Sequence, residues 1–246
     1  MKAFYLFIAL LFCNFSFSSD SRKTEADSAY LAGDYSYSLK LYSQLLNEYP
    51  HSALLYFKLG NTYFKNNERG KAIWAYYRAK KLAPNHEDIN YNLNYVLNLS
   101  EIEIESQIFD FSNRITKFLY GRGTNFWAYL TLIFTFIGTL FFYLFKTIKG
   151  KNKQRIFLVV SICSALVFII SFSLAILHYR YINTLDQGII IENAVEVKTA
   201  PSDNETTRIE LSEGMKFKLK EKQNDWFRIE LGQGEGWIKK SSALLF

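Results

Sequence analysis

Cysteine and histidine are scarce in this chain, which has two cysteines and three histidines among 246 residues. Cys13 and Cys163 lie in separate apolar stretches, a spacing that predicts neither an internal disulfide nor a cysteine-based zinc site. The histidines are scattered, at His51, His86 and His178. The sequence also has no nucleophile motif and no glycine-rich phosphate-binding loop. It therefore predicts a protein that is not an enzyme and that uses no cofactor.

Acidic residues are missing from one strongly basic decapeptide, "KTIKGKNKQR", at residues 146–155. Its basic side chains are Lys146, Lys149, Lys151, Lys153 and Arg155. Such a cluster indicates either a nucleic-acid-binding surface or the edge of a membrane. Segments 19–100 and 188–246 have nearly balanced charge, which argues against nucleic acid as a partner. The formal net charge of +6 therefore reflects membrane topology.

Charged residues are also missing from the two flanks of this decapeptide, residues 123–145 and 156–178. Each flank is long enough to provide the roughly 20 apolar residues with which a helix crosses a bilayer. Aromatic residues suited to the membrane interface stand near the ends, at Trp127, Tyr129, Tyr143, Tyr179 and Tyr181. Two transmembrane helices joined by a basic loop are favoured over the alternative, a buried helical pair in a soluble domain.

Small side chains recur along both predicted transmembrane helices. They are Thr131, Thr135 and Thr139 on the first helix and Ser164, Ser171 and Ala175 on the second. Because small faces let helices approach closely in lipid, we expect these two stripes to meet.

The basic loop also predicts orientation. Short loops rich in Lys and Arg stay cytoplasmic, so both flanking domains are expected on the opposite, exported face. Residues 1–18 support this orientation because they have the basic start, apolar centre and small final residues of a secretory signal peptide. A lipoprotein signal at Cys13 is a minor alternative, disfavoured by the bulky Phe12 before it.

Residues 19–100 contain two stretches related by an offset of 34 residues. The second stretch carries Leu59, Gly60, Tyr63, Ala72, Tyr76, Ala79 and Pro84. This pattern resembles the tetratricopeptide repeat, whose paired antiparallel helices cross at small residues. The helix expected after Pro84 has an apolar face that would cover the second repeat.

Repeats of this kind bind partners on the concave face formed by the first helix of each pair. The predicted protein-binding groove consists of Leu54, Phe57, Asn61, Phe64, Tyr91 and Tyr95. Packing between neighbouring repeats is the alternative role for these aromatic side chains. A charged clamp for a terminal carboxylate is not expected, because Phe57 stands where a lysine would help.

Residues 188–246 change to short alternating strands separated by turns, which predicts a small all-β domain. Gly214 before a strand, Trp226 opening the next, and "GWI" around Trp237 resemble a bacterial SH3-type domain. Trp226 and Trp237 are a possible aromatic binding surface, or alternatively pack within the barrel. Two linkers complete the chain. Residues 101–122 are an amphipathic juxtamembrane segment or an ordinary linker helix, and residues 179–187 are a short connection.

The predicted fold is a multidomain membrane protein with α-helical tetratricopeptide repeats, two transmembrane helices and a small SH3-like barrel. This order, with "DINYNLNYVLN" and "NFWAYLTLIF", resembles the BatE-like proteins of the Bacteroides aerotolerance operon. The resemblance implies a scaffold in the bacterial inner membrane with periplasmic domains. Its implied partners are von Willebrand A-type membrane proteins and a MoxR-type ATPase system. The alternative function is a cell-wall anchor or sensor that binds peptidoglycan through the SH3-like domain.

Overall fold

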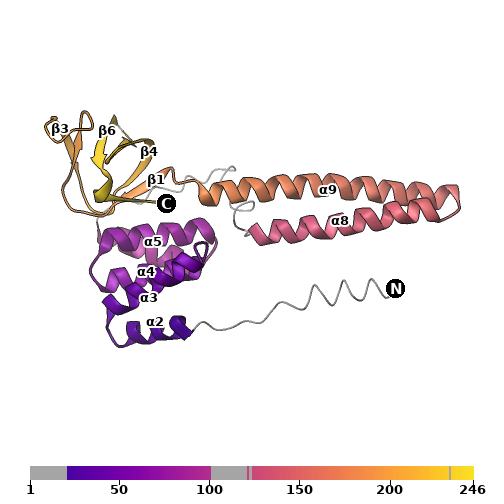
Figure 1. Ribbon diagram of the computed structural model, residues 1–246, viewed down its shortest axis with the longest axis horizontal. Coiled ribbons are helices and arrows are strands. Elements are labelled where there is room, and N and C mark those ends of the chain that lie inside the picture. The colour runs from indigo at the N-terminus through magenta and orange to yellow at the C-terminus, as the bar shows by residue number, and fades with distance from the viewer. Residues whose placement is uncertain (1–20, 101–120, 122–123, 233) are drawn as a thin grey trace.

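The computed structural model describes residues 21–100, 121, 124–232 and 234–246 (Figure 1). The expected signal peptide, residues 1–18, and nearly all of the expected linker 101–122 lie outside the described residues. A stack of short helices and a β-sheet lie together at one end of a long helical hairpin (Figure 1).

The helical stack, called the array below, consists of consecutive antiparallel helices. They are α2 (Ser21–Leu31), α3 (Tyr35–Glu48), α4 (Ala53–Lys65), α5 (Arg69–Leu82) and α6 (Glu87–Leu99). Local residues set the helix starts. The Asp34 side chain accepts a hydrogen bond from the Tyr37 backbone N–H at 3.0 Å, and Ser52 accepts one from Leu55 at 3.3 Å. Such caps satisfy backbone donors that a helix start leaves without partners.

The core of the array depends on small residues at the helix crossings. The buried Tyr76 ring lies so close to Gly60 that a Cβ there would come within 2.7 Å of it. The apolar face predicted for the helix after Pro84 is confirmed, because Ile89, Leu93 and Val96 are each 1% exposed. The helical region is therefore built as paired antiparallel helices, and its assignment to the tetratricopeptide family stays a prediction.

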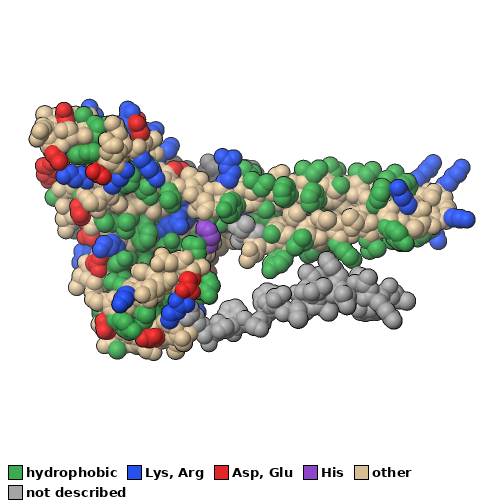
Figure 2. Space-filling view, in the orientation of Figure 1, with side chains coloured by type: hydrophobic (Ala, Val, Ile, Leu, Met, Phe, Trp, Pro, Cys, Tyr) green, Lys and Arg blue, Asp and Glu red, His purple; other side chains and the backbone are tan. Residues whose placement is uncertain are grey.

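The hairpin consists of α8 (Thr124–Thr147) and α9 (Lys151–Asn183), both long and apolar enough to cross a membrane. Hydrophobic side chains cover its sides and basic side chains gather at its tip (Figure 2). The turn is shorter than the loop expected at 146–155, because only residues 148–150 lie outside the helices. Lys, Gln and Arg are good helix formers, so α9 begins within the basic segment. It also continues through residues 179–183 of the expected linker.

The two small-residue stripes meet, but not at every expected position. Thr131 donates a hydrogen bond to the Ser171 hydroxyl at 3.0 Å across the hairpin. Farther along, Gly138 makes the close approach, since a Cβ there would lie 3.4 Å from the Ser164 side chain. Thr135 and Thr139 instead donate hydrogen bonds to carbonyls of their own helix and stay exposed. The remaining member of the second stripe, Ala175, is half-buried.

The C-terminal part is an antiparallel seven-stranded sheet in the order β3-β2-β6-β5-β4-β1-β7. Its strands are β1 (Gln187–Ile190), β2 (Val195–Lys198), β3 (Thr207–Leu211), β4 (Lys216–Gln223), β5 (Trp226–Leu231), β6 (Gly234–Lys239) and β7 (Ala243–Leu245). Alternate residues such as Val197, Ile229 and Ile238 face one shared apolar core. Gly214 takes a φ of +89° in the turn before β4, a conformation that favours glycine.

Candidate functional site

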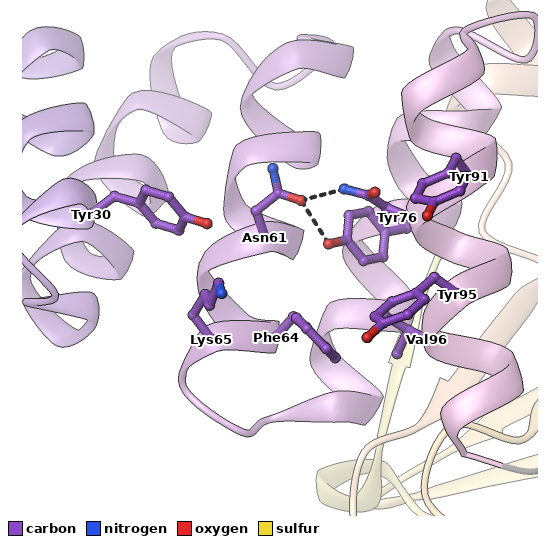
Figure 3. A pocket seen from close by; sticks show the side chains of 9 residues that line it. Tyr30, Asn61, Phe64, Lys65, Tyr76, Tyr91, Tyr95 and Val96 are labelled. Carbon is purple, nitrogen blue, oxygen red and sulfur yellow. Dashed lines mark hydrogen bonds between the residues drawn. The ribbon is translucent and has the colours of Figure 1, made fainter.

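A cavity of about 400 Å³ opens between α2, α4 and α6 and is called the groove below (Figure 3). It is lined by Tyr30, Asn61, Phe64, Lys65, Tyr76, Tyr91, Asn92, Tyr95 and Val96. Helices α2, α4 and α6 are each separated by an intervening antiparallel helix. The groove is therefore the open side of the array, where alternate helices face the same way.

Asn61 is held in one orientation at the centre of the groove. Its Oδ1 accepts hydrogen bonds from the Tyr76 hydroxyl at 2.7 Å and from Asn92 Nδ2 at 2.9 Å (Figure 3). Burial raises the pKa of Tyr76, so this hydroxyl stays a neutral donor. Because both bonds use the Asn61 oxygen, its Nδ2 amide can donate a hydrogen bond to a ligand in the groove.

Aromatic rings and one lysine surround this amide. Phe64 and Tyr95 pack edge to face with ring centroids 5.9 Å apart. Tyr91 is 71% exposed, far more than a side chain that only packs neighbouring helices. Lys65 lies one turn beyond Asn61 on α4, and within the described part of the chain no acidic side chain pairs with it. The groove thus combines apolar walls with donors and positive charge.

The structure places four of the six predicted groove residues together, namely Asn61, Phe64, Tyr91 and Tyr95. Phe57 instead packs between the rings of Tyr76 and His86, with both centroids 6.1 Å away. Leu54 lies in the first turn of α4, 46% exposed and outside the groove.

Four polar or aromatic lining residues were not predicted as groove residues, namely Tyr30, Lys65, Tyr76 and Asn92. Tyr76 was assigned only to the repeat pattern. Lys65 and Asn92 could have been found from helical spacing, since Lys65 stands four residues after Asn61 and Asn92 stands three residues before Tyr95. Tyr30 could not have been found in this way, because the first helix lacks the repeat pattern that would have shown which of its faces lines the groove.

Trp226 and Trp237 lie on the outer face of the sheet. Trp226 pairs with Lys239 and Trp237 with Arg228 in the β5–β6 register, which makes the two tryptophans diagonal neighbours on one face. Trp226 is only 9% exposed and has the Lys239 amine 5.9 Å from its ring centroid, whereas Trp237 is half-buried. Trp237 is therefore the more accessible of the pair.

The sheet is docked on α5, so the two expected modules share a core. The Gly70 backbone N–H donates to Glu213 Oε1 at 2.6 Å. One helical turn on, Trp74 Nε1 donates to the Leu245 backbone oxygen at 2.7 Å. After another turn, the Tyr77 and Phe246 rings stack with centroids 4.9 Å apart. The outer face of α5 is consequently covered by the sheet.

Lys81 joins the array to the end of α9. Its side chain is 9% exposed, and its amine donates to the Thr184 backbone oxygen at 2.6 Å. The same amine lies 4.0 Å from the Asp186 carboxylate and 5.1 Å from the Tyr181 ring centroid. Burial lowers the pKa of Lys81, while the Asp186 carboxylate opposes that shift. The array, sheet and hairpin meet at this lysine.

The chain thus combines a helical N-terminal region, two apolar helices that could span a membrane, and a C-terminal antiparallel sheet. Residues 192–243, from just before β2 into β7, match the bacterial SH3 domain family. No curated protein matches the chain. Among the described residues, no group of three His, Cys, Asp or Glu side chains is placed to hold a metal ion.

Proposed function

We propose that this protein is a non-catalytic scaffold anchored in the bacterial inner membrane by α8 and α9. The array and the SH3-like domain would face the periplasm, because Lys146, Lys149, Lys151, Lys153 and Arg155 cluster at the hairpin tip and would hold it in the cytoplasm. The observation that supports a binding role most directly is the groove, with its fixed Asn61 amide beside exposed aromatic rings.

The chemistry of the groove favours one class of partner segment. Asn61 Nδ2 and the Lys65 amine both suit an acceptor that carries negative charge, such as a carboxylate. Tyr91, Tyr95 and Phe64 suit an apolar side chain beside it, and interface energy concentrates in such aromatic contacts. The proposed ligand is therefore a protein segment with an acidic group next to an apolar side chain.

The resemblance to BatE-like proteins supports particular partners. Von Willebrand A-type membrane proteins and a MoxR-type ATPase system would belong to the same complex, with a role in aerotolerance or stress. In this proposal the scaffold brings these proteins together and performs no reaction itself.

The test is co-purification of crosslinked partners from native membranes with full-length variants. Tyr91→Ala and Lys65→Glu alter exposed groove side chains, so the array should still fold. Losing one true anchor should cost roughly 2 kcal/mol, about thirtyfold in affinity. Matched controls are Tyr37→Ala and Lys40→Glu on α3, outside the groove. Unchanged recovery of every partner with both groove variants would reject the groove.

A second candidate function, peptidoglycan binding, is supported by the match of residues 192–243 to bacterial SH3 domains. Trp237 and the neighbouring Lys198 and Arg228 would form the contact surface. Purified cell wall should then retain the wild-type protein, and Trp237→Ala should release it. Equal retention of the wild type and Trp237→Ala by cell wall would show that this surface does not bind peptidoglycan.

A further inference from the structure

One end of the array faces the same way as the hairpin. Lys81, in the last turn of α5, is bonded to Thr184 just beyond α9. Because the helices alternate in direction, α4 begins, α3 ends and α2 begins at this same end (Figure 1). The bidentate pair between Arg22 and Glu48, with its shorter contact 2.5 Å, confirms that the start of α2 adjoins the end of α3.

The depth of this end follows from the length of α9. The apolar stretch of α9 ends at Leu177, and Thr184 stands seven residues later, about 10 Å farther along a helix. The polar headgroup layer on each side of a bilayer is about 5–7 Å thick. Lys81 therefore lies near the outer limit of the headgroups. With the proposed anchoring, the turns that follow the helix ends on this side of the array would lie at the level of that layer.

The turn between α3 and α4 has the side chains that this layer accommodates. Tyr49 is 53% exposed and Leu54 is 46% exposed, and Pro50 and His51 between them are also exposed. Tyrosine is enriched at membrane interfaces because its ring is apolar and its hydroxyl is polar. Glu48, the residue before Tyr49, forms an ion pair with Arg22, so its charge is balanced.

We infer that Tyr49, Pro50, His51 and Leu54, called the α3–α4 corner, contact the lipid headgroup layer beside the hairpin. This inference rests on the membrane anchoring proposed above. The array then has two supports on the bilayer, the Lys81 junction with α9 and this corner. It lies along the membrane, with Tyr91 in the second turn of a helix that also starts at the membrane end. The groove would consequently favour partner segments held close to the bilayer.

The test uses single cysteines in the full-length protein, reconstituted in phosphatidylethanolamine–phosphatidylglycerol vesicles. Cys163 and Cys13 are replaced by serine, and bimane is attached at His51→Cys, Ser36→Cys or Leu166→Cys. Ser36 is exposed near the start of α3, roughly 20 Å from the α3–α4 corner at the other end of that helix. Leu166 is an exposed residue of α9. Lipids brominated near the headgroup or along the chains quench the fluorophore at short range.

We expect headgroup-proximal bromine to quench the label at position 51 at least twofold more than the label at 36, with chain bromine quenching position 166. Tyr49→Asp with Leu54→Asp should bring quenching at 51 down to the level at 36. Equal quenching at 51 and 36, with 166 quenched, would overturn the lipid contact and keep the membrane anchor. Absence of quenching at 166 would overturn the anchor itself, and the corner inference with it.

Discussion

The indole nitrogen of Trp74 donates a hydrogen bond to the backbone oxygen of Leu245, a residue 171 positions later in the chain. This bond stands at the centre of the docking between α5 and the SH3-like domain. The groove keeps its opening, because α5 contributes Tyr76 to its lining while Trp74 and Tyr77 face the sheet. A partner in the groove and a ligand on the outer sheet would therefore occupy one body at the same time.

Gly70 should be essential to this docking. A Cβ at Gly70 would lie 2.7 Å from the Ile190 backbone oxygen and 2.9 Å from Ile191 Cα, atoms that cannot move as a side chain does. We expect Gly70→Ala to destabilise the docked state by about 1–3 kcal/mol, the usual cost of overpacking. The measurement is thermal unfolding and protease resistance in detergent. Gly232→Ala is the control, because nothing lies within 4 Å of its new methyl group. Matching melting curves for the two variants would show that the close contact at Gly70 does not hold the sheet on α5.

Much of the architecture was predictable because it depends on local patterns. Charge-free runs marked the two apolar helices, alternation marked the strands, and Gly60 beside Tyr76 was visible as a small residue at a helix crossing. The groove was predicted in part. Phe57 was assigned there by helical spacing, yet its ring packs against Tyr76 and His86.

The docking of the sheet on α5 could not have been predicted from these patterns. Trp74 and Tyr77 occupy positions that an isolated repeat would expose or use against another repeat. Nothing in the sequence pairs them with Leu245 and Phe246, since the contact depends on how α9 and β1 place the sheet. The short hairpin turn was missed for a different reason. Basic residues indicate which side of a membrane a loop occupies, but Lys and Arg are also good helix formers. The positions of the basic residues therefore could not show where the helices end and the turn begins.

Asp27 should make the array sensitive to acid. It accepts hydrogen bonds from Tyr42 and, at 2.6 Å, from Lys58. Burial alone would raise the pKa of Asp27, but these bonds outweigh burial and hold the pKa below its usual value. A lowered carboxyl pKa stabilises the fold above the unfolded-state value of about 3.9, and this stability is lost as pH falls through the folded-state pKa.

We therefore expect Asp27→Asn to melt at a lower temperature than wild type near pH 6, with the gap narrowing below about pH 4. The melting temperatures are measured by helical circular dichroism in detergent. Glu210→Gln, an exposed carboxyl on β3, should show no such convergence. A melting-temperature difference that stays constant across the whole pH range would show that the substitution acts through packing and not through the charge of Asp27.

Lys81 should control how firmly the array is held to the hairpin. Lys81→Met keeps the buried methylenes but removes the donor to the Thr184 oxygen, which leaves a carbonyl in a partly buried site without that bond. We expect faster amide hydrogen exchange across residues 181–186 and an unchanged helical content. Lys40→Met, at an exposed position of α3, is the matched control. Identical exchange in both variants would mean that the junction is held by other contacts.

Topology is tested by reporter fusions. A reporter active only in the periplasm should work when fused after Phe246 or after Ser100 and should be silent when inserted at Gly150. The reason is the concentration of basic residues at the hairpin tip, which resists translocation. Activity at Gly150 would reverse the proposed orientation, while silence at all three positions would argue against export.

The unbroken course of α9 has a rotational consequence. From Lys151 to Asn183 the helix has no interruption, so its number of residues sets the rotation about the helix axis at which the array and sheet are attached. One residue added or removed between Ser171 and Thr184 would turn that direction by about 100° and move it by about 1.5 Å. The face of α9 that packs on α8 and the direction in which the groove opens around the hairpin axis are therefore fixed relative to each other. Copies that associated through the same face of the hairpin would present their grooves at one fixed angle.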